Sequence, residues 1–204
     1  QLITTPVWDF TVACGSTRLK FTSLRIRLTD VGVDWANVIQ DVELYTVEDA
    51  DPSHTETVTT STFSGTNNKN ITFTLSNSNN DAGDVKNGTT DTFRFRFRFK
   101  TSIGAAEKAI LDGKNLKITV SNTDFTGITS GSVVVGSISS ANIPIQVSAS
   151  KYTITSQPSV VGLNKDFTLT VNATDANGNF DLGNTSTVTL ARGATGTGAI
   201  SSAD

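Results

Sequence analysis

The stretch Thr92–Lys100 reads TFRFRFRFK, an unbroken alternation of aromatic and cationic side chains. Successive side chains of a β-strand point to opposite faces, whereas helical spacing would scatter both sets around an axis. One face therefore carries Phe93, Phe95, Phe97 and Phe99, and the other carries Arg94, Arg96, Arg98 and Lys100. The pattern predicts a half-buried strand whose apolar face is covered by a second sheet.

Other segments of the first 149 residues have the composition of strands that could provide this cover. They are Pro6–Ala13, Leu19–Leu28, Val38–Val47, Thr55–Phe63, Asn70–Leu75, Asn115–Ser121, Gly131–Ile138 and Ile143–Ala149. Helix is favoured at one place, Ile103–Leu111, where Ala, Glu, Lys and Leu cluster. The sequence predicts an all-β chain, with an antiparallel β-sandwich of Ig-like or jelly-roll-like type over residues 1–149.

A second unit is expected over residues 150–204. Its strands are predicted at Tyr152–Ser156, Phe167–Ala173 and Thr185–Leu190. An Ig-type sandwich needs about seven strands, so this unit is an incomplete Ig-like domain. Half a sandwich leaves an apolar face and a sheet edge open. We expect the chain to continue beyond Asp204 and complete the domain; the alternative is a strand from a neighbouring subunit.

Composition excludes several classes of protein. The chain has 204 residues, of which 36% are hydrophobic and 17% charged, and its net charge is -3. Regular alternation of apolar residues and low net charge argue against disorder. Mild acidity argues against nucleic acid as a partner, since such domains are basic. No apolar run approaches the roughly 20 residues that a membrane span requires, so no membrane insertion is expected.

Catalytic residues are scarce. Cys14 is the single cysteine and His54 the single histidine, so neither an intrachain disulfide nor a zinc cluster can form. No G-x-S-x-G nucleophile elbow is present. Cys14 is expected to be a small apolar residue of the first strand, and His54 a surface-loop residue. The sequence therefore predicts a protein that is not an enzyme.

The cationic face of Thr92–Lys100 is the first candidate ligand site. Arginine matches carboxylates in a bidentate manner, so Arg94, Arg96, Arg98 and Lys100, joined by Arg25 and Arg27, could bind a surface polysaccharide. The alternative is cross-strand pairing with acids such as Asp41 and Glu43. Trp35 is expected to pack over a sheet end; exposed on a flat face, it would instead suit sugar binding.

A second candidate site has the alternate-oxygen spacing of a calcium loop. Asp175, Asn177, Asn179 and Asp181 provide it, but the EF-hand pattern requires a glutamate at position 12, where this chain has Ser186. Asn-Gly in this segment is also typical of a plain hairpin turn. The acidic loop Glu48–His54 is a weaker calcium candidate. No other cofactor is indicated.

Several motifs of the second unit resemble the bacterial Ig-like repeats of large secreted surface proteins, especially those of Bacteroidota. They are Ser156–Pro158, Phe167–Val171, Asp175–Asn179, Val188–Leu190 and Gly196–Gly198. Residues 1–149 resemble, more loosely, a β-sandwich found ahead of such repeats, through Trp35, Val38–Tyr45, Lys100–Ser102 and Thr123–Phe125. Family members include gliding and surface adhesins exported by type IX secretion, whose C-terminal sorting signal this sequence does not show.

The resemblance implies an extracellular cell-surface protein, a stalk or filament segment of a large multidomain adhesin. Its partners would be further domains of the same chain or neighbouring subunits. Two alternatives stay open: a carbohydrate-binding module of a secreted glycoside hydrolase, and a self-assembling pilin-like subunit completed by a neighbour's strand.

Overall fold

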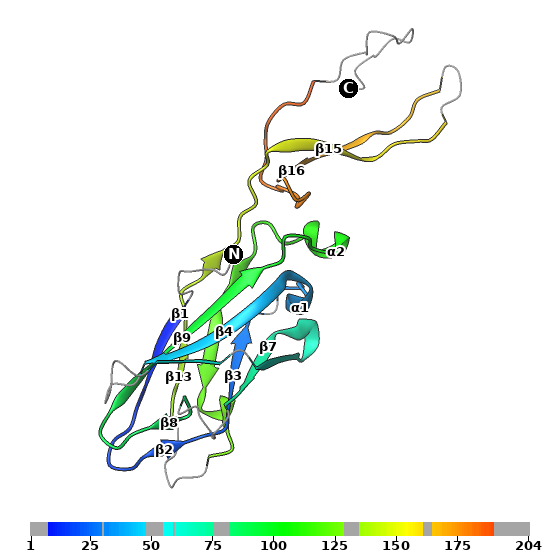
Figure 1. The fold of residues 1–204 in the computed structure, drawn as a ribbon. Helices are drawn as coiled ribbons and strands as arrows, with labels where there is room; N and C mark the ends of the chain where they lie inside the picture. Colours follow the sequence, from blue (N-terminus) through cyan, green and yellow to red (C-terminus); the bar gives the residue numbers. More distant parts are fainter. Residues whose placement is uncertain are drawn as a thin grey trace.

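A computed structural model describes residues 8–29, 31–47, 55–58, 60–75, 82–128, 135–160 and 165–189. The acidic loop Glu48–His54 lies outside the described residues. Nearly all elements are strands, and every strand pair is antiparallel, which confirms the all-β prediction. Figure 1 shows the strands of residues 8–144 gathered in one body, with the last two strands beyond one end of it.

The strand containing the Phe/Arg alternation is β9 (Thr90–Phe99), and it lies inside a four-stranded sheet. We call this the β9 sheet. Its order is β1 (Trp8–Ala13), β9, β4 (Ile39–Val47) and β5 (Thr55–Val58). Phe93 and Phe95 are fully buried and Phe97 is 6% exposed, whereas the arginines between them are partly exposed. The period-two alternation therefore sets which face is core.

A second sheet, the β3 sheet, covers this apolar face. Its order is β13 (Ser137–Ser139), β11 (Ile118–Ser121), β3 (Ser23–Leu28), β7 (Asn70–Thr74) and β6 (Ser61–Ser64), with β12 (Phe125–Thr126) also paired to β3. The rings of Phe73 and Phe95 meet edge-on across the two sheets, with centroids 6.1 Å apart. The buried aliphatic residues Leu24, Ile26 and Ile71 complete the contact.

Three predicted strands are each divided in the structure, and one of them, Asn115–Ser121, becomes β10 (Asn115–Leu116) and β11. Leu19–Leu28 becomes β2 (Leu19–Lys20) and β3, because Phe21 N donates to Gly83 O while Thr22 N donates to Thr126 O. β2 pairs with β8 (Asp84–Val85) at the end of the body farthest from the C-terminal strands (Figure 1). Thr55–Phe63 becomes β5 and β6, so that one segment forms an edge of both sheets.

Short helices and turns close the ends of the sheets. α1 (Trp35–Val38) begins after Asp34, whose Oδ1 accepts from Ala36 N, and no helix is predicted there from the sequence. α2 (Ala105–Lys108) lies within the predicted helical segment. The remaining elements are the 3₁₀ turns η1 (Thr66–Asn68) and η2 (Asn122–Asp124), and the pair β10 (Asn115–Leu116) and β14 (Ile143–Pro144).

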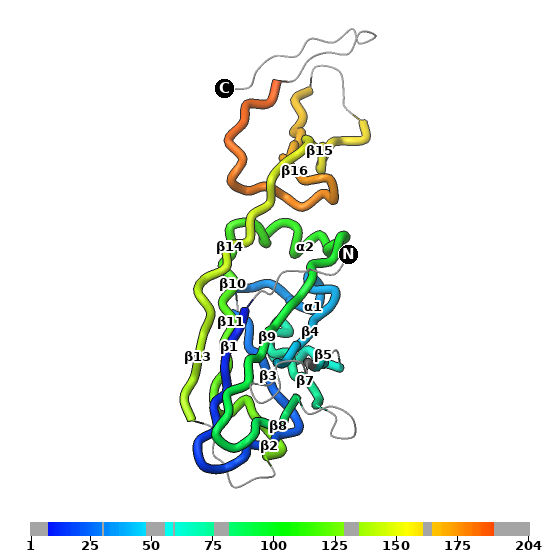
Figure 2. The backbone as a smooth tube through the Cα atoms, turned by 60° about the vertical axis from the view of Figure 1, so that its left-hand side comes forward, coloured from blue at the N-terminus to red at the C-terminus, as the bar shows by residue number. Residues whose placement is uncertain are grey.

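The C-terminal segment forms a two-stranded sheet of β15 (Lys151–Ser156) and β16 (Thr170–Thr174), which we call the hairpin. The predicted strand at Thr185–Leu190 is wrong over residues 185–189, which have no strand pairing. A strand needs a partner edge for its backbone groups, and none is formed there among the described residues. Figure 2 shows the hairpin continuing the long axis of the molecule beyond α2 and β14.

Candidate functional site

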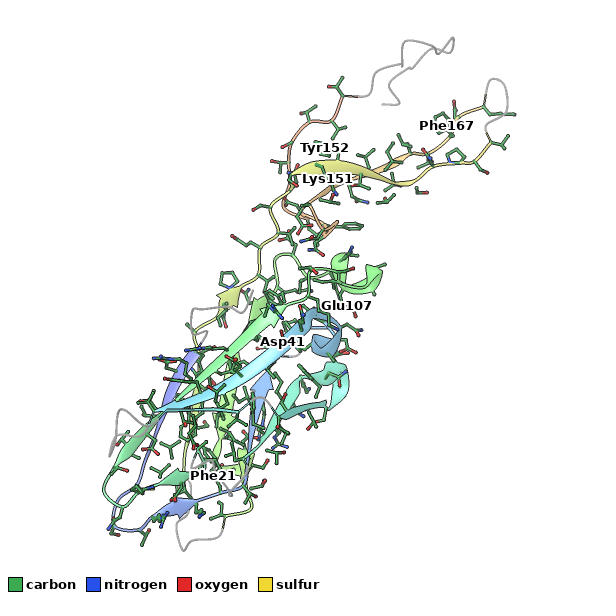
Figure 3. The ribbon with its side chains drawn as sticks, viewed as in Figure 1. Phe21, Asp41, Glu107, Lys151, Tyr152 and Phe167 are labelled. Atoms are coloured by element: carbon green, nitrogen blue, oxygen red, sulfur yellow. The ribbon has the colours of Figure 1, made fainter. Side chains whose placement is uncertain are left out.

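The cationic row of β9 faces carboxylates on the two neighbouring strands. Arg94 donates from Nε and Nη2 to the two carboxylate oxygens of Asp9, at 2.9 Å each. This hydrogen-bonded pair raises the pKa of Arg94. Arg98 hydrogen-bonds to Asp41 on β4, and Figure 3 marks Asp41 on that strand. The predicted cross-strand pairing is therefore present in the structure.

Arg96, at the centre of the row, is the least satisfied of the three arginines. Its Nη1 lies 3.9 Å from Glu43 Oε2, which is beyond hydrogen-bonding distance. Its guanidinium carbon lies 5.0 Å from the centroid of the Tyr45 ring, within the range of a cation–π contact. Its Nε is buried and has no hydrogen-bond partner within the described residues. Arg96 is thus the row's strongest candidate for an external anion.

Lys100 lies at the end of the row and serves the fold. Its Nζ donates to the carbonyl of Ala36 at 2.7 Å, so it ties β9 to the short helix α1. A backbone carbonyl leaves the ammonium charge uncompensated, unlike the carboxylates that meet Arg94 and Arg98. Lys100 can still hold a water or an anion with its remaining donors.

Arg25 and Arg27 do not extend the row. Both lie on β3, and because the two sheets face each other through their apolar sides, their outer faces point in opposite directions. Both Nε atoms donate to Oδ1 of Asp124, at 2.6 and 2.8 Å. Asp124 is completely buried. Burial raises its pKa, but hydrogen bonds from Arg25, Ser121 and Arg27 outweigh burial and hold the pKa below its usual range.

Trp35 is not a ligand platform. Its side chain is fully buried, and its Nε1 donates to the carbonyl of Thr29 at 3.0 Å. It packs at the end of the sheets, as its place in the sequence indicated. Trp8 is partly exposed, and its ring is stacked on Phe10 with centroids 4.9 Å apart. Trp35, the tryptophan whose exposure would have favoured sugar binding, is therefore part of the core.

The four residues with calcium-loop spacing form a hydrogen-bonded turn. Oδ1 of Asp175 accepts from Asn177 N and Asn179 N at 2.9 Å each, and Oδ2 accepts from Asn179 Nδ2 at 2.8 Å. Burial raises the pKa of Asp175, but these bonds from Asn179 and Asn177 outweigh it and lower the pKa. Oδ2 of Asp181 accepts from Ala149 N at 2.9 Å. The turn alternative thus describes this segment.

A metal would have to compete with these N–H donors for the same oxygens. Throughout the described part of the chain, no three His, Cys, Asp or Glu side chains are placed to hold a metal ion. The residues here fit a cation poorly, because the amide groups that point at Asp175 are donors.

An uncharged cavity of about 400 Å³ lies between the edge strands β1 and β13. Phe10, Cys14, Phe125 and Ile138 are among its lining residues. Cys14 follows the last residue of β1, so it lies outside the predicted first strand, and its side chain is half-buried. Burial raises the pKa of its thiol, which keeps it neutral and poorly nucleophilic.

Sequence reasoning missed three polar residues that organise the molecule: Lys108, Asp112 and Asp124. Their partners are distant in the chain, as with Arg25 and Asp124, which are separated by 99 positions. No local pattern marks such a residue, because a single acid in a turn has the same sequence environment whether or not it meets a distant donor.

Within the described ranges, every helix is too short and too polar to cross a bilayer. Comparison with protein-family models, with curated proteins and with solved structures found no match.

Proposed function

We propose that this chain is a non-enzymatic structural segment of an extracellular cell-surface protein, forming part of the stalk or filament of a multidomain adhesin. Residues 1–149 would be an Ig-like or jelly-roll-like sandwich. Residues 150–204 would be part of an Ig-like domain. Such a segment would space a binding tip from the cell and carry load through its strand ladders.

The observation that supports this proposal is the open apolar surface of the hairpin. Tyr152 and Ile154 on β15 are 46% and 50% exposed, and Phe167, three residues before β16, is 58% exposed. Figure 3 marks Tyr152 and Phe167. A two-stranded sheet is marginally stable alone in water. Exposed side chains of this size and strand edges of this kind are typical of a surface that other strands cover.

The charges of the β9 sheet agree with a structural role. Arg94 and Arg98 have carboxylate partners within the same sheet, and Glu43 lies 3.9 Å from Arg96, so three of the row's four cations lie beside an acid of the sheet. Arg96 keeps the surface-polysaccharide hypothesis open at one position. Its Nε is buried and its side chain is 24% exposed, so an external anion would have to bind through the other nitrogens of the guanidinium group.

The intact mass of the native mature protein tests the proposal. A mass far above 21.5 kDa, together with loss of the protein when intact cells are treated with protease, is the expected result. A mature protein that is protected from protease on intact cells and released only by lysis would refute the surface location.

One alternative is supported by the same open hairpin. A self-assembling subunit would cover it with a strand from the next copy. This alternative predicts a native mass near 21.5 kDa and concentration-dependent polymers of residues 1–204 in light scattering. The carbohydrate-module alternative has lost its main support, since Trp35 is buried.

A further inference from the structure

The hairpin meets the body of the molecule through three segments that are distant in the chain. They are the end of α2 with the turn that follows it (residues 108–113), the connection between β14 and β15 (residues 145–150), and the turn after β16 (residues 175–184). Figure 2 shows these segments side by side where the hairpin begins. We call this region the joint.

Asp112 lies at the centre of the joint. Its Oδ1 accepts from Val147 N at 2.7 Å, in the connection to β15. Its Oδ2 accepts from Leu182 N at 2.7 Å and Gly183 N at 3.2 Å, in the turn after β16. One carboxylate of the body therefore accepts hydrogen bonds from backbone amides at both ends of the hairpin segment.

Lys108 and Asp181 add cross-links on either side of Asp112. Lys108 Nζ donates to Asn177 O at 2.9 Å, and Phe180 N donates to Lys108 O at 3.3 Å. Asp181 Oδ2 accepts from Ala149 N at 2.9 Å, which fastens the turn to the connection. The residues with calcium-loop spacing are thus part of the joint.

We infer that Asp112 is a clamp that fixes the hairpin relative to the β9 and β3 sheets, so that the two parts move as one rigid body. Units joined by a single connection and a small polar interface ordinarily move relative to each other. Charge-assisted hydrogen bonds to backbone amides are directional and oppose such motion. This inference does not depend on where the protein resides or on what it binds.

Asparagine at position 112 is an informative substitution. It keeps the shape of aspartate but replaces one acceptor oxygen by an NH₂ donor. That donor would face either the amide of Val147 or those of Leu182 and Gly183, so one side of the clamp opens. Alanine opens both sides.

Distance distributions between two spin labels test the clamp. Residues 1–204 carry Cys14→Ser, and labels are attached after Thr57→Cys on β5 and Ser156→Cys at the end of β15, both exposed positions. Double electron–electron resonance should give one narrow distribution. Asp112→Asn should broaden it, and Asp112→Ala should broaden it further.

Asp41→Asn is the matched control. It removes the same charge from an ion pair that lies within the β9 sheet, and it should leave the distribution unchanged. Hydrogen exchange of the β9 amides establishes that the sheets of each variant stay folded. A broad distribution in the unsubstituted protein overturns the inference without any variant, and so does an equally narrow distribution in Asp112→Ala.

Discussion

Arg94 and Asp9 form a bidentate pair across β9 and β1, with two nitrogen–oxygen distances of 2.9 Å. The pair lies at the exposed surface, with 31% and 40% of the two side chains accessible. Its geometry is good, yet solvent screens its charges. The ion pairs of the β9 row therefore agree with the register of the strands, but no single exposed pair contributes much to the stability of the sheet.

A double-mutant cycle of Arg94→Ala and Asp9→Ala should give a coupling energy of about 0.2–1 kcal/mol, as for other exposed pairs. Urea denaturation of the parent, the two single variants and the double variant measures it. The coupling should shrink as salt is added, because exposed charges are screened. A coupling that is unaffected by salt would contradict an exposed pair.

Removing the Asp124 carboxylate should lower the free energy of unfolding much more than removing the Arg94–Asp9 pair. Asp124→Asn leaves Arg25 and Arg27 without an anionic partner, and we expect a loss of about 2–3 kcal/mol at pH 7. Because both arginines are more than a third exposed, water compensates part of the lost interaction. Denaturant unfolding measures this loss, with Asp41→Asn as a surface control.

Stability should depend on pH through Asp124 and Asp84. The hydrogen bond from Arg18 lowers the pKa of Asp84 despite burial. The hydrogen bonds from Arg25, Ser121 and Arg27 lower the pKa of Asp124 in the same way. An unfolded aspartate has a pKa of about 3.9, so the unfolded state takes up protons first as the pH falls. Their contribution should be complete above about pH 4 and decrease below it. Asp124→Asn should flatten this acid slope, and an unchanged slope would count against the assignment.

Trp35→Ala should destabilise the body by about 3–5 kcal/mol, as for other buried aromatic residues. Trp35→Phe keeps most of the volume but loses the hydrogen bond to Thr29, so a smaller loss is expected. In a Trp8→Phe background, the emission of Trp35 should stay unchanged when oligosaccharides are added. A sugar-dependent shift of that emission would revive the carbohydrate-binding hypothesis.

Two glycines near the β2 end should respond differently to alanine. A Cβ at Gly83 would lie 2.1 Å from the carbonyl oxygen of Phe21, so Gly83→Ala should cost about 1–3 kcal/mol or more. A Cβ at Gly15 meets nothing within 4 Å, and Gly15→Ala should change stability by less than about 0.5 kcal/mol. Thermal unfolding of the two variants distinguishes them, and equal effects would contradict the close approach of the two loops.

Ile154→Thr should be neutral within about 0.5 kcal/mol in residues 1–204, because the side chain is half exposed there. In a longer native protein whose Ig-like domain is complete, the same change should cost about 1.5–3 kcal/mol, since the side chain would then be buried. Denaturant unfolding of Ile154→Thr and its parent, in residues 1–204 and in the longer protein, measures both losses of stability. Neutrality in both would mean that nothing covers this face.

Alternation predicted β9 and its buried face because strand periodicity is local information. Pairing is not local, and this explains where the predictions failed. Leu19–Leu28 has the composition of one strand, but the chain bends at Phe21 to meet Gly83. Thr55–Phe63 divides because each half reaches the edge of a different sheet.

At the candidate site too, local features could be predicted from the sequence and contacts between distant segments could not. The sequence indicated Asp41 and Glu43 as partners for the arginine row, since both lie on a strand with the matching period. It indicated Trp35 over a sheet end but left exposure on a flat face as an alternative, because burial depends on the cover from other segments. The calcium spacing belongs to a turn in which Asp175 accepts hydrogen bonds from Asn177 and Asn179, as the Asn-Gly alternative indicated.

The charges of β9 have a further consequence for folding. Before the sheets assemble, the stretch Thr92–Lys100 carries four cations and four phenylalanines. The acids that pair with its arginines are far away in the chain: Asp41 is 57 positions from Arg98, and Asp9 is 85 positions from Arg94. Sheets with such distant pairing form slowly and expose their apolar strands meanwhile. Until then, like-charge repulsion between copies acts as a gatekeeper against aggregation. The same arginines therefore protect the nascent chain from self-association and, once paired, give the finished sheet its register.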